Sequence, residues 1–332
     1  MLKVAVVGLG WWGRTIAGLL KGNSKISLVK GVDVTPEAER FSSAQGIAFS
    51  DSFEKTVDDP AVQAVVLCTP HSQHCEQIVR AANAKKHVFC EKPLSLSRAD
   101  VLKAVAACNA NGVALAVGHE KRFEPPIVEL FRMAAAGELG KLLQVEANFS
   151  QDKFLAMPAD NWRLTEKEAP AGPMTATGIH LLDLSIGLLG PAESVLTRVR
   201  QLASGLTNGD TLSLQVSFSN GTNALISAIL ATPFDGRFAV YGSQGWAEVR
   251  DKAHPESPQG WTLTCSLRGK GKQVREFPPA KAVLANLEAF ADAAAGRAAY
   301  PVPQDQMIEN ICALEAVFKS ARTGNIEKVE KQ

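Results

Sequence analysis

The sequence predicts an α/β protein, in which a doubly wound parallel sheet is followed by an α+β domain built on a large, mostly antiparallel open sheet. Over the first 120 residues, short apolar runs rich in β-branched side chains alternate with helical segments. Beyond about residue 122, the strand-like segments instead alternate apolar and polar side chains, as in a sheet with one wetted face. The length of 332 residues favours two domains, which we place at 1–121 and 122–332.

The first half alternates strands with helices. The run LKVAVVG (2–8) is continuously apolar, which indicates a strand buried on both faces of a parallel sheet. Pro36 and Ser97 stand where helices are expected to begin. Gly22 and Gly112 stand where helices are expected to end. We expect strands at 2–8, 26–34, 61–70, 86–93 and 113–120, and helices at 14–22, 36–46, 75–84 and 97–112.

The second half is dominated by strands whose side chains alternate in polarity, and helices close the chain. We expect strands at 142–150, 194–203, 210–219, 222–231 and 237–250, and helices at 174–190, 286–296 and 304–324. Thr175 or Thr177 is the expected cap of the first of these helices. Such a pattern is typical of an open antiparallel sheet with helices on one side.

The composition is that of an ordinary globular protein, with 46% hydrophobic and 21% charged residues. Lys and Arg total 35 against 34 Asp and Glu, which leaves a formal charge of +1. There is no run of Lys and Arg with interleaved aromatic residues. Nucleic acid is therefore not an expected partner.

The cysteines and the apolar segments indicate a cytoplasmic protein. The six cysteines form no Cys-x-x-Cys pair and no metal-ligand spacing, so we expect buried thiols in a reducing compartment and no metal site. No stretch approaches the roughly 18 apolar residues that span a bilayer. The N-terminus lacks the pattern of a secretion signal, and we expect no membrane partner.

The stretch GLGWWG (8–13) matches the G-x-G-x-x-G pattern of a dinucleotide-binding loop. It follows a strand and opens a helix, and Asp33 ends the next strand 20 residues after Gly13. Gly8 would allow the tight turn, Gly10 the approach of a pyrophosphate to backbone N–H groups, and Gly13 close packing of helix on strand. Asp33 would accept hydrogen bonds from the adenosine ribose and repel a 2′-phosphate. No Arg or Lys occurs in 34–38, so the sequence favours NAD over NADP.

Trp11 and Trp12 place two indole rings inside this loop. They do not contradict the prediction, because only the glycine positions must be small and the intervening side chains can point away from the phosphates. One interpretation is that both rings pack against the helix or a neighbouring domain. The other is that one ring covers the pyrophosphate or lines the entrance for substrate, which makes both residues candidates for the cofactor site.

Eight short stretches spread over nearly the full length recur together in one known family, in the same order: GLGWWG (8–13), CTPHSQH (68–74), HVFCEKPLS (87–95), KRFEP (121–125), NWR (161–163), TGIHLLD (177–183), YGSQGWAEV (241–249) and SARTG (320–324). On these stretches the chain resembles the Gfo/Idh/MocA oxidoreductases, the family of glucose–fructose oxidoreductase and inositol dehydrogenase. The resemblance implies a Rossmann domain followed by an α/β domain whose open sheet commonly carries the contact of a homodimer or homotetramer.

In the EKP stretch, Lys92 follows a buried parallel strand at its C-terminal end, the side on which such sheets bind ligands. An ammonium group there can stabilise the alkoxide that develops as hydride leaves a substrate. By resemblance Lys92 is the active-site lysine and Glu91 lies beside the nicotinamide ribose. Lys85 and Lys86 are expected to be solvated. Thr69, Pro70, His71 and His74 would line the same ribose, although each histidine could equally be a helix-start residue satisfied by backbone groups.

The stretch MTATGIHLLDLSIGLLG (174–190) holds the second candidate catalytic residue. By resemblance His180 accepts the hydroxyl proton of the substrate, a role that a neutral imidazole can take. Asp183 shares its helix face and is a candidate for contact with the substrate, or for fixing the helix or the histidine tautomer. Many polyol-oxidising members carry Asp four residues before the histidine, where this chain has Ala176. This departure puts simple cyclic polyols in doubt as substrates.

The remaining candidates for substrate binding are Trp162, Arg163 and Arg122. An indole face beside a guanidinium suits a sugar ring, or a carboxylate or phosphate on one. Arg122 could equally form a structural ion pair. Asp152 and Lys153 follow a strand and could border the site, and the sequence does not choose between an acidic and a neutral cyclic substrate.

Three functions are consistent with these residues. The first is an NAD-dependent dehydrogenase acting on a secondary alcohol of a sugar, cyclitol or related cyclic compound. The second is an enzyme that uses bound NAD transiently during an epimerisation or elimination. The third is a non-catalytic dinucleotide sensor, which Lys92 and His180 argue against and Ala176 argues for.

Overall fold

The structure is a computed structural model that describes residues 1–330, and the chain forms two compact units. Unit 1 comprises Met1–Glu120 and Val283–Met307, and unit 2 comprises Lys121–Ala282 and the chain from Ile308 onward. The chain thus leaves unit 1 close to the expected boundary at 121. It later returns to unit 1 at Val283–Met307, so the predicted division at one boundary misses this second segment.

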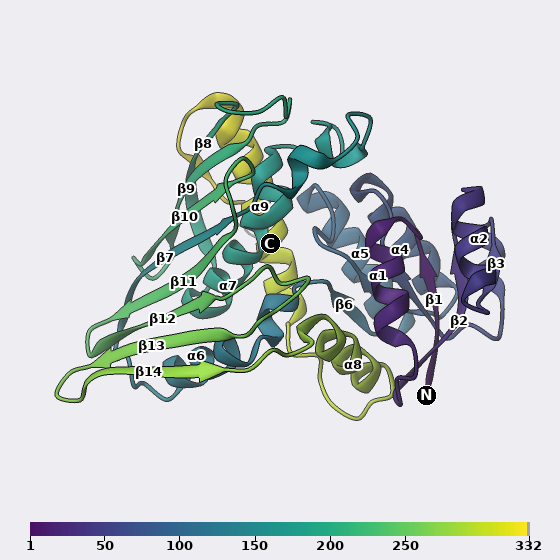
Figure 1. The fold of residues 1–332 in the computed structure, drawn as a ribbon, viewed down its shortest axis with the longest axis horizontal. Coiled ribbons are helices and arrows are strands. Elements are labelled where there is room, and N and C mark those ends of the chain that lie inside the picture. The colour runs from purple at the N-terminus through teal and green to yellow at the C-terminus, as the bar shows by residue number, and fades with distance from the viewer. Residues whose placement is uncertain (331–332) are drawn as a thin grey trace. The chain divides into compact units, whose positions relative to one another are not determined.

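Unit 1 is built on a parallel sheet of six strands in the described chain, in the order β3-β2-β1-β4-β5-β6. This order, with helices as the crossovers, confirms the predicted doubly wound sheet (Figure 1). Its strands are β1 (Leu2–Val7), β2 (Ile26–Val32), β3 (Ala48–Ser50), β4 (Ala64–Leu67), β5 (His87–Cys90) and β6 (Leu115–Val117). Its helices are α1 (Trp11–Leu20), α2 (Pro36–Ala44), α3 (Phe53–Asp58), α4 (His74–Asn83), α5 (Arg98–Asn111) and α8 (Ala282–Ala294).

The core of unit 1 combines both of its segments. Phe89 of β5 packs edge-on against Phe290 of α8, with ring centroids 5.8 Å apart, and Leu287 joins the same cluster. The Tyr300 hydroxyl donates a hydrogen bond to the Val117 carbonyl over 2.9 Å. The returning segment therefore completes the hydrophobic core that the first 120 residues begin.

Helix ends in unit 1 follow the predicted signals. The Ser97 hydroxyl accepts a hydrogen bond from the Asp100 N–H at the start of α5, as an N-cap does. Gly112 follows α5 with φ of 62°, the left-handed conformation that favours glycine at this position. α1 begins at Trp11, three residues before the predicted start, so both tryptophans belong to its first turn.

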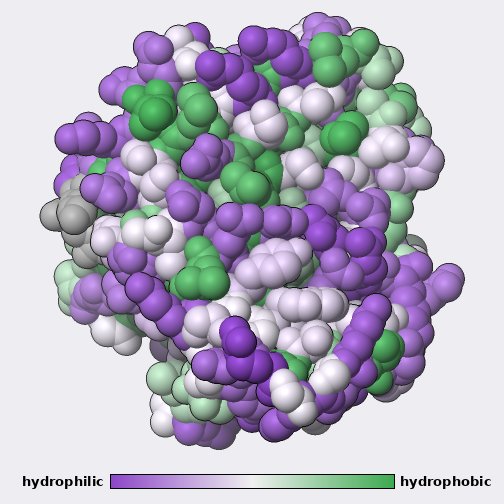
Figure 2. All heavy atoms as spheres, turned by 90° about the vertical axis from the view of Figure 1, so that its left-hand side faces the viewer, coloured by the Kyte–Doolittle hydropathy of each residue, from purple (hydrophilic) through white to green (hydrophobic). Residues whose placement is uncertain are grey.

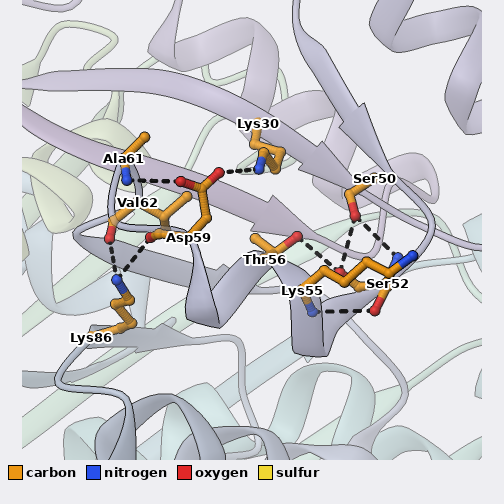
Figure 3. A network of polar contacts seen from close by, with 9 residues as sticks. All are labelled: Lys30, Ser50, Ser52, Lys55, Thr56, Asp59, Ala61, Val62 and Lys86. Atoms are coloured by element: carbon orange, nitrogen blue, oxygen red, sulfur yellow. Dashed lines mark hydrogen bonds and ion pairs between the residues drawn. The ribbon is translucent and has the colours of Figure 1, made fainter.

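β3 and α3 lie in a stretch for which the sequence analysis predicted no element, because both are too short to show a hydrophobic period. Side chains fix this stretch (Figure 3). The Asp59 carboxylate accepts the Ala61 N–H and pairs with Lys30. The Lys86 ammonium donates to the carbonyls of Asp59 and Val62 over 2.9 and 2.7 Å. The expectation of a solvated Lys86 was therefore wrong, because its ammonium donates hydrogen bonds to backbone carbonyls beside the sheet.

Unit 2 is built on an open sheet that has nine strands within residues 1–330, in the order β14-β13-β12-β11-β7-β10-β9-β8-β15. All adjacent strands are antiparallel except β7 and β10, which confirms the predicted mostly antiparallel sheet. The strands are β7 (Leu142–Ser150), β8 (Ala192–Arg200), β9 (Thr211–Phe218), β10 (Asn223–Ile229), β11 (Asp235–Gly242), β12 (Gly245–Asp251), β13 (Trp261–Leu267), β14 (Gly271–Phe277) and β15 (Glu327–Lys328).

One predicted strand is in fact a hairpin. The segment 237–250 forms β11 and β12, joined by a tight turn in which Gly242 pairs with Gly245. Tyr241 and Trp246 lie opposite each other, so both sides of the turn look like continuous strand in the sequence. β13 and β14 were missed. β14 lies at the sheet edge and is mostly exposed, so its sequence GKQVREF shows no apolar face.

The long helices of unit 2 are α6 (Pro125–Ala135), α7 (Ile179–Leu189) and most of α9 (Gln304–Thr323). They lie on one face of the open sheet (Figure 1). Its other face, which we call the open face, carries hydrophobic side chains in patches among hydrophilic ones (Figure 2). Across residues 1–330, none of the helices combines the length and the hydropathy that a membrane crossing requires.

Candidate active site

The glycine loop between β1 and α1 has the geometry of a dinucleotide cradle. A Cβ on Gly13 would lie 1.9 Å from the Gly8 carbonyl oxygen, and a Cβ on Gly8 would lie 2.8 Å from the backbone of Cys68. These two glycines are therefore required by the packing of the protein itself. A Cβ on Gly10 would meet no protein atom within 4 Å, although its backbone suits any residue, with φ of −65°. This open space, next to the N-terminus of α1, fits an approaching pyrophosphate.

Asp33 is tied to the glycine loop. Its carboxylate accepts the Leu9 N–H over 2.7 Å, and its second oxygen accepts the N–H and hydroxyl of Thr35, each over 3.0 Å. The carboxylate is thereby fixed at the end of β2, at the position that the fingerprint assigns to ribose recognition. A fixed negative charge there disfavours a 2′-phosphate.

The two tryptophans of the loop have different environments. Trp11 is 47% exposed, whereas Trp12 packs against the hydrophobic core of unit 1. The two indole rings lie 5.2 Å apart. Packing thus accounts for Trp12, which agrees with the first of the two interpretations. The exposed ring of Trp11 stays a candidate for cofactor contact.

Glu91 is a buried carboxyl group at the end of β5. Burial and the charge of Glu120 raise its pKa to about 7, while Trp12 and Lys92 act in the opposite direction. A Cβ on Gly118 would lie 2.5 Å from the Glu91 carboxylate, so glycine at 118 leaves the room that this group occupies. Gly118 and Glu120 are site residues that the sequence analysis did not single out. Their signal was the stretch VGHE after the last parallel strand.

The raised pKa of Glu91 predicts a pH-dependent stability. In the unfolded chain the group ionises near its ordinary value of 4.5, so from there to about pH 7 the folded protein binds more protons. Stability is therefore expected to fall as pH rises from about 4.5 to 7. Glu91→Gln should abolish this part of the fall and raise the melting temperature at pH 8. Thermal unfolding between pH 4.5 and 8 measures the dependence of stability on pH. Glu193→Gln, which removes the carboxylate of an exposed residue, is the control. Parallel pH profiles of Glu91→Gln and wild type would contradict the prediction.

Lys92 follows Glu91 directly, and its backbone N–H faces a Glu91 carboxylate oxygen at 3.3 Å. The side chain is half-buried at the C-terminal end of β5. Its ammonium lowers the pKa of the Glu91 carboxyl, against the effect of burial. Unit 1 therefore presents an acid and a cation at the strand end where ligands of parallel sheets bind.

The two histidines of the CTPHSQH stretch lie next to each other, with ring centroids 5.7 Å apart. His74 is fully buried, and its two nitrogens lie 2.8 Å from the Pro93 carbonyl oxygen and 3.0 Å from that of Thr69. It joins the loop after β4 to the loop that carries Lys92, which favours the backbone-satisfied interpretation. The Thr69 hydroxyl donates to Gln77 over 2.6 Å. Pro70 directly precedes the 3-10 turn that begins with His71.

In unit 2, the segment around His180 differs from the predicted capped helix. Met174–Gly178 is a π-helix that leads into α7. The hydroxyls of Thr175 and Thr177 donate to the carbonyls of Gly172 and Pro173, over 3.2 Å each, so neither is the expected N-cap. His180 is buried, with its ring 6.1 Å from that of Phe149. π-helical turns are frequent at functional sites.

Ala176 packs against an apolar cluster formed by Phe154, Leu206 and Leu230. A carboxylate there would face hydrocarbon and lose hydration. The apolar surroundings thus agree with alanine rather than aspartate at residue 176. In this unit the candidate base is therefore His180, with no equivalent acid at residue 176.

Arg122 and Asp183 bind each other. The guanidinium donates to both carboxylate oxygens over 2.6 and 3.0 Å and to the Asp183 carbonyl over 2.7 Å, and both side chains are buried. A Cβ on Gly187 would lie 2.2 Å from the guanidinium, so the helix is shaped around it. This geometry favours the structural ion pair over contact with substrate.

Trp162 and Arg163 lie in a short 3-10 turn, and the guanidinium of Arg163 stacks 4.1 Å over the indole ring. Both residues are half-buried, and the Asn208 amide holds the turn by donating to the Arg163 carbonyl over 3.1 Å. Lys153 pairs with Glu256, and Asp152 is exposed. Within residues 1–330, no group of three or more His, Cys, Asp or Glu side chains could hold a metal ion.

The fold of unit 1, its glycine loop and the acidic end of β2 define an oxidoreductase with an NAD(P)-binding Rossmann domain. Models of two families match the chain: an oxidoreductase family with an NAD-binding Rossmann fold over residues 2–119, and the GFO/IDH/MocA C-terminal domain over residues 127–248. The chain belongs to the Gfo/Idh/MocA oxidoreductase family. The resemblance predicted from its motifs is thereby confirmed.

Several similar proteins are named as enzymes that act on a sugar or on inositol. The chain is 28% identical over 311 residues to 1,5-anhydro-D-fructose reductase of Ensifer adhaerens, with 90% of each chain covered. It is also 28% identical over 254 residues to inositol 2-dehydrogenase of Rhizobium meliloti (strain 1021), with 74% of each covered. The solved structure of aldose-aldose oxidoreductase from Caulobacter crescentus, complexed with glycerol, matches with a TM-score of 0.86 and 26% identity. That match covers 98% of this chain and 99% of the other.

Proposed function

We propose that this protein is an NAD-dependent dehydrogenase that oxidises a secondary alcohol of a sugar, cyclitol or related cyclic compound, or reduces the corresponding ketone. The observation that carries the proposal is the space at Gly10, which no protein atom occupies and which lies at the N-terminus of α1. Membership of the family and the names of its relatives support the substrate class.

The two catalytic roles fall to one residue of each unit. Lys92 donates a hydrogen bond to the reacting hydroxyl and stabilises the negative charge that develops on its oxygen. His180 accepts the hydroxyl proton, and the C–H bond electrons leave as hydride, so the alcohol becomes a ketone. The bound nicotinamide supplies the two-electron acceptor. In the reverse direction His180 returns the proton to the oxygen.

The test is a screen of the pure protein with NAD and NADP against sugars, sugar acids, cyclitols and dihydrodiols. The absorbance of the reduced nucleotide is the readout. Net reduction of the nucleotide with a cyclic alcohol is the expected result. Conversion of substrate without released NADH would favour the transient use of bound NAD. Binding of nucleotide without any conversion across the panel would contradict the proposal and favour a sensor.

The preference for NAD is proposed from Asp33, whose charge is held at the end of β2. Asp33→Asn keeps an acceptor for the Leu9 N–H but removes the charge that repels a 2′-phosphate. We expect the ratio of NAD to NADP affinity to fall at least about tenfold. Nucleotide titrations followed by protein fluorescence measure it, with Glu193→Gln as the control for charge. An unchanged ratio would show that another residue selects the cofactor.

A homodimer or homotetramer through the open face is the proposed assembly. A shallow groove on this face is lined by Leu196 and Leu225 together with Arg198, Arg237 and Glu146. Leu225 is exposed, and the mixture of apolar side chains with both signs of charge suits a self-complementary contact. Light scattering tests this, because the monomer has a mass of 35.4 kDa.

A cytoplasmic location is the last part of the proposal. None of the six cysteines forms a disulfide, and all but Cys68 are buried. Burial raises the pKa of Cys75 to about 11 and of Cys108 to about 12, so these thiols resist ionisation. Buried cysteines outside disulfides are typical of a reducing compartment.

A further inference from the structure

Unit 2 contains a second imidazole, half-buried, that contacts the same phenyl ring as His180. His254 lies in the loop between β12 and β13, and its ring contacts Phe149 at 6.0 Å and Phe234 at 5.5 Å between centroids. Phe149 is the same phenyl ring that His180 contacts at 6.1 Å. Both imidazoles therefore border one aromatic side chain at the end of β7.

The surroundings of His254 fix its protonation. Its Nδ1 accepts the Glu256 N–H over 3.2 Å, which places the remaining hydrogen on Nε2. Burial lowers its pKa to about 4, and the ammonium groups of Lys153 and Lys121 act in the same direction. At neutral pH the ring is thus an uncharged donor. Its Nε2 is buried and has no hydrogen-bond partner.

An acceptor without a partner lies on the same strand end. Gln151 follows β7 two residues after Phe149, and strand alternation places both side chains on one face of the sheet. Its backbone N–H continues the ladder by donating to the Ile229 carbonyl over 2.8 Å. The side chain is buried, and its Oε1 has no hydrogen-bond partner. Buried polar groups left without partners are uncommon, and a ligand is one explanation for them.

The cations near these groups are paired with carboxylates. Lys121 contacts Glu124 and Asp251, at 3.2 and 3.1 Å, and the Lys153 ammonium pairs with Glu256. Asp251 also accepts the Trp261 indole N–H over 3.0 Å. A neutral donor and a neutral acceptor in such surroundings suit a hydroxyl group, which both accepts and donates, better than a carboxylate or phosphate.

We infer that His254 and Gln151 form a subsite for one hydroxyl group of a neutral polyhydroxy substrate, away from the carbon that is oxidised. The inference rests on the proposed function and narrows its substrate class from acidic or neutral to neutral cyclic compounds. The Nε2–H of His254 donates to the hydroxyl oxygen, and the hydroxyl donates to Oε1 of Gln151. Phe149 and Phe234 form the apolar wall of the subsite.

The test compares a neutral sugar or cyclitol that the wild type oxidises with its series of single-deoxy analogues. One deoxy position should lower kcat/KM of the wild type by about 10- to 100-fold, because it leaves a buried donor and acceptor unpaired. His254→Phe keeps a ring against Phe149 and Phe234 but lacks the N–H, and Gln151→Met keeps the length but lacks the amide. Each variant should lose the discrimination at that one position and keep it at the others. Gln144→Met, which makes the same exchange elsewhere on β7, is the matched control, and should keep the discrimination.

The possible outcomes separate this inference from the proposed function. Turnover of neutral cyclic alcohols by the wild type supports the proposed function whatever the variants do. If both variants then retain the wild-type preference at every deoxy position, the subsite is refuted and the proposed function stands. Preference for sugar acids over the neutral parent compounds also refutes it. Absence of turnover by the wild type across the panel refutes both.

Discussion

Replacing Lys92 with methionine is expected to lower kcat/KM by about 10²- to 10³-fold while nucleotide affinity stays within a few-fold of wild type. The methionine side chain has a similar length but cannot donate a hydrogen bond to the developing alkoxide. Removal of a single preorganised donor of this kind has effects of that size. Steady-state rates and fluorescence titration of the nucleotide measure the two quantities separately. Lys85→Met is the matched control, because Lys85 is exposed on the same unit.

A variant of His180, the second proposed catalytic residue, extends this experiment. His180→Asn should lower kcat/KM by about 10²- to 10⁴-fold, since a positioned proton acceptor is lost. Because the proposed mechanism has both residues act on one hydroxyl, the double variant is expected to lose less than the product of the two single losses. Activity of either single variant within a few-fold of wild type would show that another residue has the assigned role.

The second large effect is expected at Gly13. In Gly13→Ala the new methyl group would lie 1.9 Å from the Gly8 carbonyl oxygen, which belongs to backbone and cannot rotate away. The loop must open, at a cost of about 1–3 kcal/mol or more in the free energy of unfolding. Urea unfolding of the protein without nucleotide measures this loss, which does not depend on any assumption about the cofactor.

Gly10→Ala is the contrasting variant in the same loop. No protein atom lies within 4 Å of the added methyl group, and the backbone conformation suits alanine. The gain from a stiffer unfolded chain opposes the preference for glycine at the N-cap of α1, so the free energy of unfolding should stay within about 1 kcal/mol of wild type. Dinucleotide affinity, in contrast, should fall at least about tenfold, because the methyl group takes the space of the pyrophosphate. If Gly10→Ala bound NAD as tightly as wild type, the cradle would lie elsewhere.

The parallel sheet and its loop could be predicted from the sequence because their determinants are local. Each strand of unit 1 is a short apolar run, and the roles of Gly8 and Gly13 follow from a six-residue pattern. The caps at Ser97 and Gly112 are likewise signals within one or two turns of a helix. Such patterns need no knowledge of the tertiary structure.

The features that were missed depend on contacts between distant residues. The pairing of Arg122 with Asp183 joins residues 61 positions apart, and neither alone reveals its partner. His254 stands in a loop without a motif, and only its ring contacts with Phe149 and Phe234 draw attention to it. The hairpin at Gly242 was missed for a different reason, because its turn is flanked by aromatic residues that continue the strand pattern.

The return of Val283–Met307 to unit 1 has a consequence for biosynthesis and for engineering. During translation the nucleotide-binding half emerges first, yet Leu287 and Phe290 of its core are still more than 160 residues from being made. Its final folding must wait for nearly the whole polypeptide, in contrast to domains that mature one after another at the ribosome. A chimera that exchanges this half between relatives must therefore transplant two separate pieces of gene, and a fragment cut after residue 120 would expose the apolar surface beside Phe89.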